Sequence, residues 1–269
     1  LHNQGNQMST IASLWRYPVK SMMGEELRST KVTEKGIHGD RASALVDMET
    51  GKIVSAKNPR KWPNMFSFRS RYDDLDNSNK IRITLPDGTT VNSDDNRINS
   101  MLSKALGREV KFISQALEES QLEEYWPDIE ELDNRDIVTD EDMPKGTFYD
   151  LAIIHLLTTS TLNELSRLYP EGRFEARRFR PNIIVNTEQE GFVESGWIGN
   201  TIVIGDEVKL KITDHCPRCV MTSLEQGDLP KDTKILRTAA QHNEAHVGVY
   251  AEVIKGGTIK CTDKVSVIE

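Results

Sequence analysis

The sequence predicts a β-dominated α+β fold in which an acidic connection joins two β-rich parts. Short β-rich runs alternate with turn signals over roughly the first ninety residues, and the pattern returns after the connection. Segments with helical periodicity are few. We therefore expect an N-terminal barrel or sandwich at 8–125 and a second β-rich domain, also a barrel, at 126–269. Residues 1–7 precede Met8, have no pattern, and are interpreted as a tag or leader.

The N-terminal part contains β-rich runs, bounded by glycine or proline turns, that we expect to be strands. Their ranges are 11–17, 26–33, 42–46, 53–56, 67–72 and 81–85. A helix is expected next over 98–106, because apolar residues recur at helical spacing and Gly107 supplies a C-terminal stop. We expect this helix to cap the barrel.

After the acidic connection, the apolar run 151–157 predicts a buried strand, because it is too short for a membrane span. A helix is expected from Thr158, Thr159 and Ser160 onward, and the spacing of Thr161 and Glu164 fits a capping box. A short helix is expected at 234–242. The other expected strands are 182–186, 201–204, 208–212, 220–223, 248–254 and 265–268.

Composition limits the function classes. The chain of 269 residues has a net charge of −8, which argues against a nucleic-acid partner. Its apolar runs fall short of the roughly 20 residues that a membrane span needs, so we expect no membrane partner. Three cysteines cannot form a disulfide framework, and no secretion signal is recognisable at the start. We expect a cytoplasmic protein with free thiols.

Charge is distributed unevenly along the chain. Between 118 and 142, acidic residues far outnumber bases, and Arg135 is the only base. We expect a solvated loop or a frayed helix there. A cluster of arginines follows and is a candidate for a functional role; its members are Arg173, Arg177, Arg178 and Arg180.

The stretch HCPRCVMTS places Cys216 and Cys219 one turn apart, and it permits several kinds of chemistry. A redox disulfide needs its first cysteine at a helix N-terminus, whereas the β-branched residues after Cys219 favour a strand. A structural zinc site needs four ligands. Cys261 is alone, and His242 and His246 share a helical face only if the short helix extends that far.

In another interpretation, a single thiolate binds a soft or high-valent metal whose other ligands come from a cofactor. Such a cofactor would have to be held elsewhere, by cations and helix termini if it carries a phosphate. Simple burial of both thiols as small hydrophobic groups is also possible. It leaves Arg218 and the flanking Asp214 and His215 without a purpose.

Four separated stretches, in this order, resemble the MOSC-domain family, the molybdenum cofactor sulfurase C-terminal family. LWRYPVKSM resembles the N-terminal motif of the family, and GDRASALVD its next block. RFRPNIIV resembles its arginine–asparagine block and CPRCVMTSLEQG its metal-ligand block. The closing GVYAEVIKGGTIKCTDKV is similar to its terminal hairpin. The match runs from about Ile11 to the C-terminus and is closest to the amidoxime-reducing component and its bacterial relatives.

The resemblance implies a pterin-based molybdenum cofactor, Mo-molybdopterin, bound between a MOSC N-terminal β-rich domain and a MOSC β-barrel. It implies that Cys219 ligates molybdenum and that Cys216 is a neighbour. We expect Arg218, which is beside Cys219 in the sequence, to stabilise negative oxo or substrate groups. Planar arginine forks and backbone N–H groups suit the phosphate and pterin of such a cofactor. The implied cofactor-binding residues are Lys20, Ser21, Arg41, Thr159, Arg178, Arg180, Asn182, Pro217 and Tyr250.

These residues also fit ordinary structural roles when taken one by one. Thr159 suits a helix cap, Tyr250 suits a core position, and isolated bases such as Lys20 and Arg41 are usually surface charges. Which of the clustered arginines would contact a phosphate is left open by the sequence.

The resemblance implies an oxidoreductase that reduces N-hydroxylated compounds by oxygen-atom transfer; amidoximes, hydroxylamines and N-hydroxylated base analogues are examples. No four-cysteine cluster motif follows the last hairpin, so we expect a separate flavin, iron–sulfur or haem protein as electron donor. The acidic stretch 118–142 is a candidate docking surface. The alternative is a sulfur-carrying or cofactor-handling protein with a persulfide on Cys216 or Cys219, although no pyridoxal-phosphate desulfurase domain is recognisable.

Overall fold

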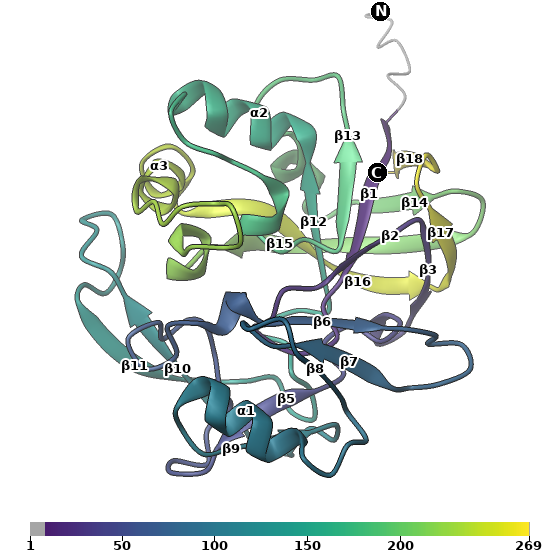
Figure 1. Ribbon diagram of the computed structural model, residues 1–269. Coiled ribbons are helices and arrows are strands. Elements are labelled where there is room, and N and C mark those ends of the chain that lie inside the picture. Colours follow the sequence, from purple (N-terminus) through teal and green to yellow (C-terminus); the bar gives the residue numbers. More distant parts are fainter. Residues whose placement is uncertain (1–8, 269) are drawn as a thin grey trace, which may run out of the picture.

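The computed structural model describes residues 9–268, and a β-barrel and a second β-rich region make up most of it (Figure 1). The segment 1–7, interpreted as a tag or leader, lies outside the described residues. Within the described part, no helix is both long and apolar enough to cross a membrane.

Seven strands close the barrel within residues 9–268. The order around the barrel is β13–β12–β16–β15–β14–β18–β1, and the pairing of β1 with β13 closes it, with Leu14 opposite Ile183. The first strand therefore belongs to a barrel whose other strands come from the second half of the chain. The strands are β1 (Ser9–Arg16), β12 (Ile154–Thr158), β13 (Ile183–Asn186), β14 (Thr201–Ile204), β15 (Val208–Pro217), β16 (His246–Lys255) and β18 (Lys264–Ile268).

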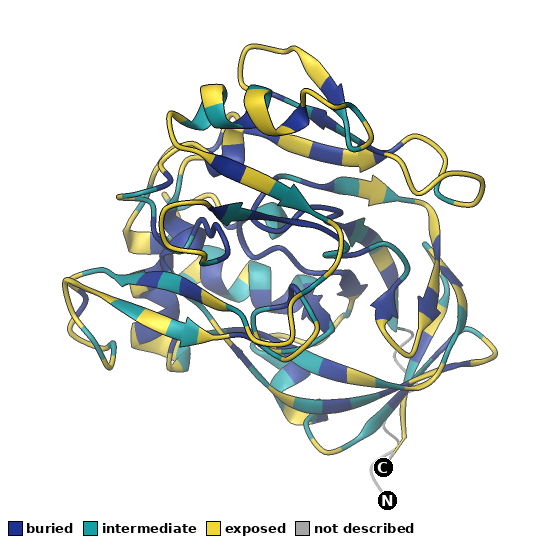
Figure 2. Cartoon of the chain, turned by 90° about the horizontal axis from the view of Figure 1, so that it is seen from below, coloured by how far each residue is buried: buried dark blue, intermediate teal, exposed yellow. Residues whose placement is uncertain are grey.

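Alternating burial along β14 and β15 directs apolar side chains into the barrel, whereas β12 is buried at every position. Ile11 and Leu14 of β1 pack in one core with Leu210 and Val249, and these side chains are almost completely buried. Figure 2 shows the buried segments gathered inside, while the exposed segments lie on hairpins and loops. Each large aliphatic side chain buried this way stabilises the fold by about 1.5–3 kcal/mol, which favours closure of the barrel.

The second region consists of smaller antiparallel sheets and one helix. Helix α1 (Ile98–Leu106) ends as predicted at Gly107, whose φ of 68° is left-handed. Strand β2 (Glu25–Leu27) extends the barrel sheet beside β1, and the late strand β17 (Gly257–Lys260) pairs with β3. The other strands of this region are β3 (Ser29–Thr33), β4 (Gly36–Ile37), β5 (Ala44–Asp47), β6 (Arg69–Tyr72), β7 (Ile81–Thr84), β8 (Thr90–Asn92), β9 (Val110–Ile113), β10 (Gln121–Trp126) and β11 (Ile137–Asp142). The β-dominated fold class predicted from the sequence is confirmed.

The core of the second region includes a side chain from the other half of the chain. Met22, Phe68 and Leu102 are fully buried there, and Met221 packs among them with the partly buried Cys219 beside it. The segment after β15 is therefore anchored in the N-terminal region, at the junction with the barrel.

The remaining helices are α2 (Thr159–Leu168), α3 (Lys234–Asn243) and the 3₁₀ turns η1 (Met65–Ser67), η2 (Ala176–Arg178), η3 (Val193–Trp197) and η4 (Val220–Ser223). Met65 and Phe66 of η1 pack in the core of the second region. The helix predicted at 234–242 is confirmed as α3. The capping box predicted at Thr161 and Glu164 is wrong, because Thr158 caps α2 by accepting a hydrogen bond from the Thr161 amide. Thr158 in turn donates to the buried carboxylate of Glu194 at 2.6 Å.

The predicted loop or frayed helix in the acidic stretch is wrong, because β10 and β11 form a regular hairpin with Gln121 opposite Asp142. Lysines from elsewhere in the chain balance part of its charge. Lys52 lies 2.6 Å from Asp140, and Lys57 lies 3.0 Å from Glu124. Counting charges within the stretch could not reveal these lysines.

The strand predicted at 220–223 is also wrong, because this segment is the 3₁₀ turn η4. Its backbone carbonyls meet an arginine instead of a neighbouring strand. Arg178 donates from Nη1 to the carbonyls of Thr222 and Leu224, each at 3.2 Å. β-branched composition indicates a strand only where a neighbouring strand is present to pair.

Two further expectations were partly wrong. The run 26–33 is divided into β2 and β3, and the run 53–56 forms only isolated bridges through Ile53. The hairpin expected at 201–204 and 208–212 is confirmed, with Ile204 opposite Val208.

Candidate functional site

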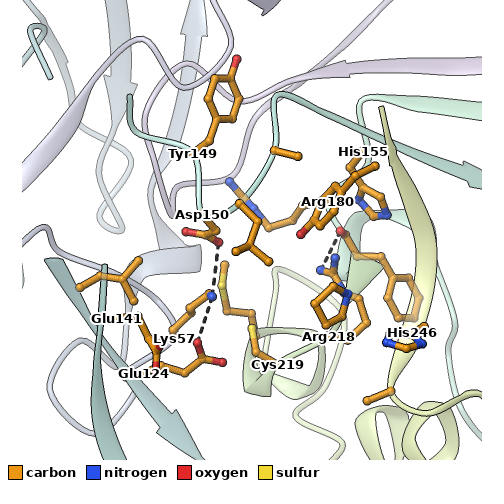
Figure 3. Close-up of a pocket in the computed structure, with 18 of the residues that line it drawn as sticks. Lys57, Glu124, Glu141, Tyr149, Asp150, His155, Arg180, Arg218, Cys219 and His246 are labelled. Atoms are coloured by element: carbon orange, nitrogen blue, oxygen red, sulfur yellow. Dashed lines mark hydrogen bonds and ion pairs between the residues drawn. The ribbon is translucent and has the colours of Figure 1, made fainter. Parts of the chain in front are cut away.

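A cavity of about 610 Å³ lies at the junction between the barrel and the N-terminal region (Figure 3). Residues from both halves of the chain line it, including Lys20 and Lys57 from one half and Arg180 and Arg218 from the other. The loop that carries Cys219 enters from the end of β15, and the hairpin β10–β11 forms another side.

The cavity brings together most of the residues selected from the sequence, although they come from distant segments. Those that line it are Lys20, Ser21, Arg41, Arg180, Asn182, Pro217, Arg218, Cys219 and Tyr250. Neither Thr159 nor Arg178 lines it.

Thr159 and Arg178 have structural partners instead. Thr159 donates to the Asn186 side chain at 3.2 Å, at the start of α2. Arg178 is completely buried and donates to main-chain carbonyls, among them that of Pro230 at 2.9 Å. It thereby holds η4, the turn that follows Cys219.

Two arginines are held against the ring of one buried tyrosine. The guanidinium carbons of Arg41 and Arg180 lie 4.4 and 4.2 Å from the ring centroid of Tyr17. Arg41 also donates to Asp40 at 2.7 Å, and Arg180 donates to the Met22 carbonyl at 2.7 Å. Burial, together with the charge of Arg41, lowers the pKa of Arg180 to about 10. These contacts fix two positive charges at the cavity before any ligand binds.

Three cavity residues have left-handed backbone conformations that side-chain-bearing residues rarely adopt. The φ angles are 64° at Ser21, 44° at Arg41 and 55° at Arg180. Such strain costs about 1–3 kcal/mol per residue and persists where surrounding contacts over-determine it, typically at functional sites.

A second charged group lines the cavity beside Cys219. Lys20 pairs with Asp150 and donates to the Phe148 carbonyl at 3.0 Å. Lys57 lies 3.0 Å from Glu124 and 3.8 Å from Asp150. Burial alone would raise the pKa of Asp150, but Lys20 and Lys57 hold it well below its usual range.

Sequence reasoning missed Lys57, Glu124 and Asp150. Asp150 lies in an irregular loop, and Lys57 lies in a turn, so neither has a periodic signal. Glu124 did carry one, because Leu122, Glu124 and Trp126 alternate along one face of β10 and all line the cavity.

The two cysteines of the motif have different environments, and only Cys219 lines the cavity. Both are free thiols. Burial raises the pKa of Cys219 to about 11, although Lys57 opposes the shift. Burial would also raise the pKa of Cys216, but Arg218 and His155 outweigh it and lower the value to about 6.

Arg218 connects the buried cysteine with the cavity. Its Nη1 donates to Cys216 Sγ at 2.8 Å, and its Nη2 donates to the Phe179 carbonyl at 2.9 Å. Its Nε is buried and has no partner within residues 9–268. A buried donor without a partner is costly, so this atom is available to a ligand that reaches it.

The donor groups suit a metal whose other ligands arrive with it. Among the described residues, no three or more His, Cys, Asp or Glu side chains are grouped so as to hold a metal ion. His215 and His246 stack with ring centroids 4.7 Å apart, but they belong to no such group. One thiol, several fixed cations and an unpartnered donor therefore match a cofactor that brings its own metal ligands and an anionic group.

Each half of the chain matches a family model of known proteins. The model of the MOSC N-terminal beta barrel domain matches residues 8–123, and that of the MOSC domain matches residues 144–266. Mitochondrial amidoxime reducing component 2 of Rattus norvegicus is 26% identical over 247 residues, covering 82% of this chain and 68% of the relative. The human protein of the same name is 25% identical over 296 residues, covering 96% and 83%.

Two more distant similarities were found, one in sequence and one in fold. Molybdenum cofactor sulfurase of Oryza sativa is 23% identical over 264 residues, covering 86% of this chain and 30% of the relative. The crystal structure of the YUAD protein from Bacillus subtilis is 12% identical and covers 97% of this chain and 95% of its own, with a TM-score of 0.50. That similarity concerns the fold alone.

Proposed function

The chain belongs to the MOSC domain family and is related to molybdenum-cofactor proteins, and from this premise we propose that it reduces N-hydroxylated compounds with a bound molybdenum cofactor. The substrates proposed are amidoximes, hydroxylamines and N-hydroxylated base analogues. The observation that carries the proposal is that one thiol, Cys219, lines the same cavity as Lys20, Arg41, Arg180 and Arg218.

In this proposal, Cys219 provides the thiolate ligand of molybdenum. Its pKa of about 11 means that the thiol is protonated at neutral pH, so metal binding has to displace that proton. Lys57 and Arg218 oppose the burial effect on this pKa and therefore assist the displacement. Cys216 is a neighbour whose role is to hold Arg218.

The basic side chains would bind the anionic parts of the cofactor. Arg41 and Arg180 are already fixed against Tyr17, and the Nε–H group of Arg218 has no hydrogen-bond partner within residues 9–268. Ser21, Asn182, Pro217 and Tyr250 lie on the same cavity and complete the proposed set. Preorganised donors bind tightly because little side-chain entropy is lost on binding.

The chemistry that the bound cofactor supplies is two-electron oxygen-atom transfer. In the overall reaction, the N–O bond breaks, two electrons and two protons are consumed, and the oxygen leaves as water. We propose that a separate flavin, iron–sulfur or haem protein delivers the electrons. The reaction also consumes protons, and the ammonium group of Lys57 holds a proton at the cavity surface, between Glu124 and Asp150.

The proposal is tested by changing Cys219 to serine in a host that synthesises the cofactor. We expect the variant to fold but to lose reduction of benzamidoxime by a chemical electron donor. Molybdenum per chain and turnover are measured on the same sample. The matched control is Cys261→Ser, because Cys261 does not line the cavity and its thiol contacts the Leu27 carbonyl. A molybdenum-loaded Cys219→Ser variant with full activity contradicts the proposal.

A sulfur-carrying or cofactor-handling role is the second candidate. The observation that favours it is the lowered pKa of Cys216, because a thiolate is the nucleophilic form of cysteine. This candidate predicts that the protein binds the cofactor without turnover. It also predicts a persulfide on Cys216 or Cys219, and mass spectrometry of the intact protein detects that added sulfur.

A further inference from the structure

A pair of stacked histidines lies at one side of the cavity. His246 is the first residue of β16 and lines the cavity, whereas His215 lies on the neighbouring strand β15. Their ring centroids are 4.7 Å apart, and the ring planes are 8° from parallel. Figure 3 shows His246 on the side of Arg218, with Lys57 on the other side of Cys219. The pair therefore places a titratable ring on the cavity wall, supported by a second ring behind it.

The backbone before His246 has an unusual conformation that determines where this ring lies. Glu244 and Ala245 have left-handed φ angles of 51° and 58°, which residues with side chains rarely adopt. The Ala245 carbonyl accepts a hydrogen bond from the Arg218 amide at 2.7 Å. The His246 carbonyl accepts one from the Asn243 side chain at 2.8 Å. Strained backbone that is held by such contacts is typical of functional sites, so the position of His246 indicates a function.

The proposed reaction consumes two protons, and His246 is suited to supply one of them. An imidazole releases and regains protons near neutral pH. The His246 side chain is half-buried, so solvent can return its proton. Within residues 9–268, His155 is the other histidine that lines the cavity, but it is buried and its Nε2 lies 3.0 Å from the Val247 carbonyl.

Other groups that line the cavity release their protons less readily. Burial would lower the pKa of Lys57, but Asp150, Cys219 and Glu124 outweigh it and raise the value. Burial raises the pKa of Tyr250 well above its ordinary value. An acid is an efficient proton donor when its pKa lies near the working pH. Lys57 and Tyr250 therefore retain their protons under conditions in which a histidine exchanges its own.

Charged and titratable groups from several elements surround His246. Burial lowers the pKa of His246, and the charge of His215 lowers it further, because two charged rings this close repel each other. Glu244, in the turn before His246, opposes the shift. His215 and Glu244 thus act on this pKa in opposite directions. Neighbouring elements bring further charged groups to the lining, which are Arg218 after β15, and Glu131 and Asp133 between β10 and β11.

We propose that His246 donates a proton to the substrate nitrogen as the N–O bond breaks, with His215 as the positioning residue that holds its ring. The inference rests on the proposed function. Two electrons come from the separate donor protein, and the nitrogen takes the proton of His246. The oxygen takes a second proton from solvent and leaves as water, and solvent then returns a proton to the neutral imidazole. Because the protonated ring is the active form, the rate is highest at low pH and falls as the pH rises through the pKa of His246.

The test compares the pKa of His246 with the pH dependence of a single turnover. NMR of the labelled histidine rings measures the pKa in the cofactor-loaded protein. The pre-reduced protein is mixed with benzamidoxime across a pH series, so that electron delivery does not limit the rate. We expect the fall in rate to coincide with the pKa of His246. The His246→Gln variant should react about a hundredfold more slowly at low pH and should lose this pH dependence.

Two substitutions shift the pKa of His246 in opposite directions. His215→Phe keeps a flat ring against His246 but removes the charge, so the pKa should rise and the fall in rate should move to higher pH. This change breaks no hydrogen bond at Nδ1 of His215, because that buried atom has no partner within residues 9–268. Glu244→Gln should lower the pKa and move the fall in rate to lower pH.

The positioning role of His215 is tested by removing its ring. His215→Ala should slow the single turnover about tenfold at low pH, and His215→Phe should restore the rate. His242→Gln is the matched control, because His242 lies in the last turn of α3 but does not line the cavity. It should change neither the rate nor the pKa of His246. Circular dichroism checks that each variant is folded.

The outcomes separate this inference from the proposed function. In an active unmodified protein, an unchanged rate after His246→Gln overturns the inference alone. A fall in rate that does not coincide with the pKa of His246, or that stays fixed while His215→Phe or Glu244→Gln shifts this pKa, also overturns it. Equal rates for His215→Ala and His215→Phe overturn the positioning role. Absence of turnover in the unmodified loaded protein overturns the proposed function, and the inference with it.

Discussion

Two groups of charged residues that line the cavity differ in how they are held in place: the arginines Arg41 and Arg180, and the carboxylates Glu131, Asp133 and Glu141 of the hairpin β10–β11. Arg41 and Arg180 are fixed by a tyrosine ring, a carboxylate and a backbone carbonyl. Among the carboxylates, Glu131 and Asp133 are exposed to solvent, whereas Glu141 is half-buried and accepts a hydrogen bond from the Thr139 hydroxyl. Rigid cations suit a cofactor that stays bound, because little side-chain entropy is lost on binding, whereas the exposed carboxylates are screened by salt.

The largest expected effect concerns the buried arginine that supports the cysteine loop. Arg178→Met should lower the free energy of unfolding by about 3 kcal/mol, because buried carbonyls of Thr222, Leu224 and Pro230 lose their donors. Chemical denaturation measures the change. Arg177→Met is the control, since Arg177 makes partly exposed ion pairs with Glu175 and Asp228, worth about 1 kcal/mol or less. Equal stability of the two variants contradicts a supporting role for Arg178.

An intermediate effect is expected for Arg180, which lines the cavity. Arg180→Met should reduce retained molybdenum by about tenfold or more after gel filtration, because a preorganised buried cation is lost. Metal analysis per chain is the measurement. Arg173→Met is the control from the same arginine cluster, because Arg173 lies outside the cavity and contacts Asp228. If both variants retain equal molybdenum, Arg180 does not contribute to cofactor binding.

The smallest effect is expected for the cavity carboxylates of the hairpin β10–β11, which are Glu131, Asp133 and Glu141. For a cationic N-hydroxylated substrate, kcat/KM should fall about two- to fivefold between low and high ionic strength, because salt screens partly exposed charges. For a neutral substrate of the same shape, kcat/KM should change little. Steady-state kinetics across a salt series distinguishes the two. A parallel decline for both substrates would indicate that salt acts on electron delivery or stability and not on substrate charge.

Local patterns were sufficient for much of the fold. Helix α1 could be predicted together with its end, because its apolar spacing and Gly107 act within one segment. The β14–β15 hairpin could be predicted for the same reason. The segments 118–142 and 220–223 were misjudged because distant residues decide them. Lys52 and Lys57 stabilise the acidic hairpin, and Arg178 occupies the carbonyls of η4.

The candidate site could also be predicted only in part from the sequence. Motif resemblance was enough to select Lys20, Arg41, Arg180 and Cys219, and all four line one cavity. It also selected Arg178, which the structure places in a supporting position. The guanidinium groups of Arg178 and Arg180 point in different directions, one to backbone carbonyls and the other to the cavity. The sequence does not show this difference, because the two residues lie in the same short motif.

By itself, the sequence determined that this is a β-rich protein of the MOSC type with one cysteine motif and a cluster of bases. Those properties reside in short segments, where composition, periodicity and motif order are directly readable. Only the tertiary structure decided that β1 completes a barrel from the other half of the chain and that the acidic hairpin faces Cys219. These are contacts between residues far apart in the chain, and their free energy depends on three-dimensional packing and charge pairing that no local pattern encodes.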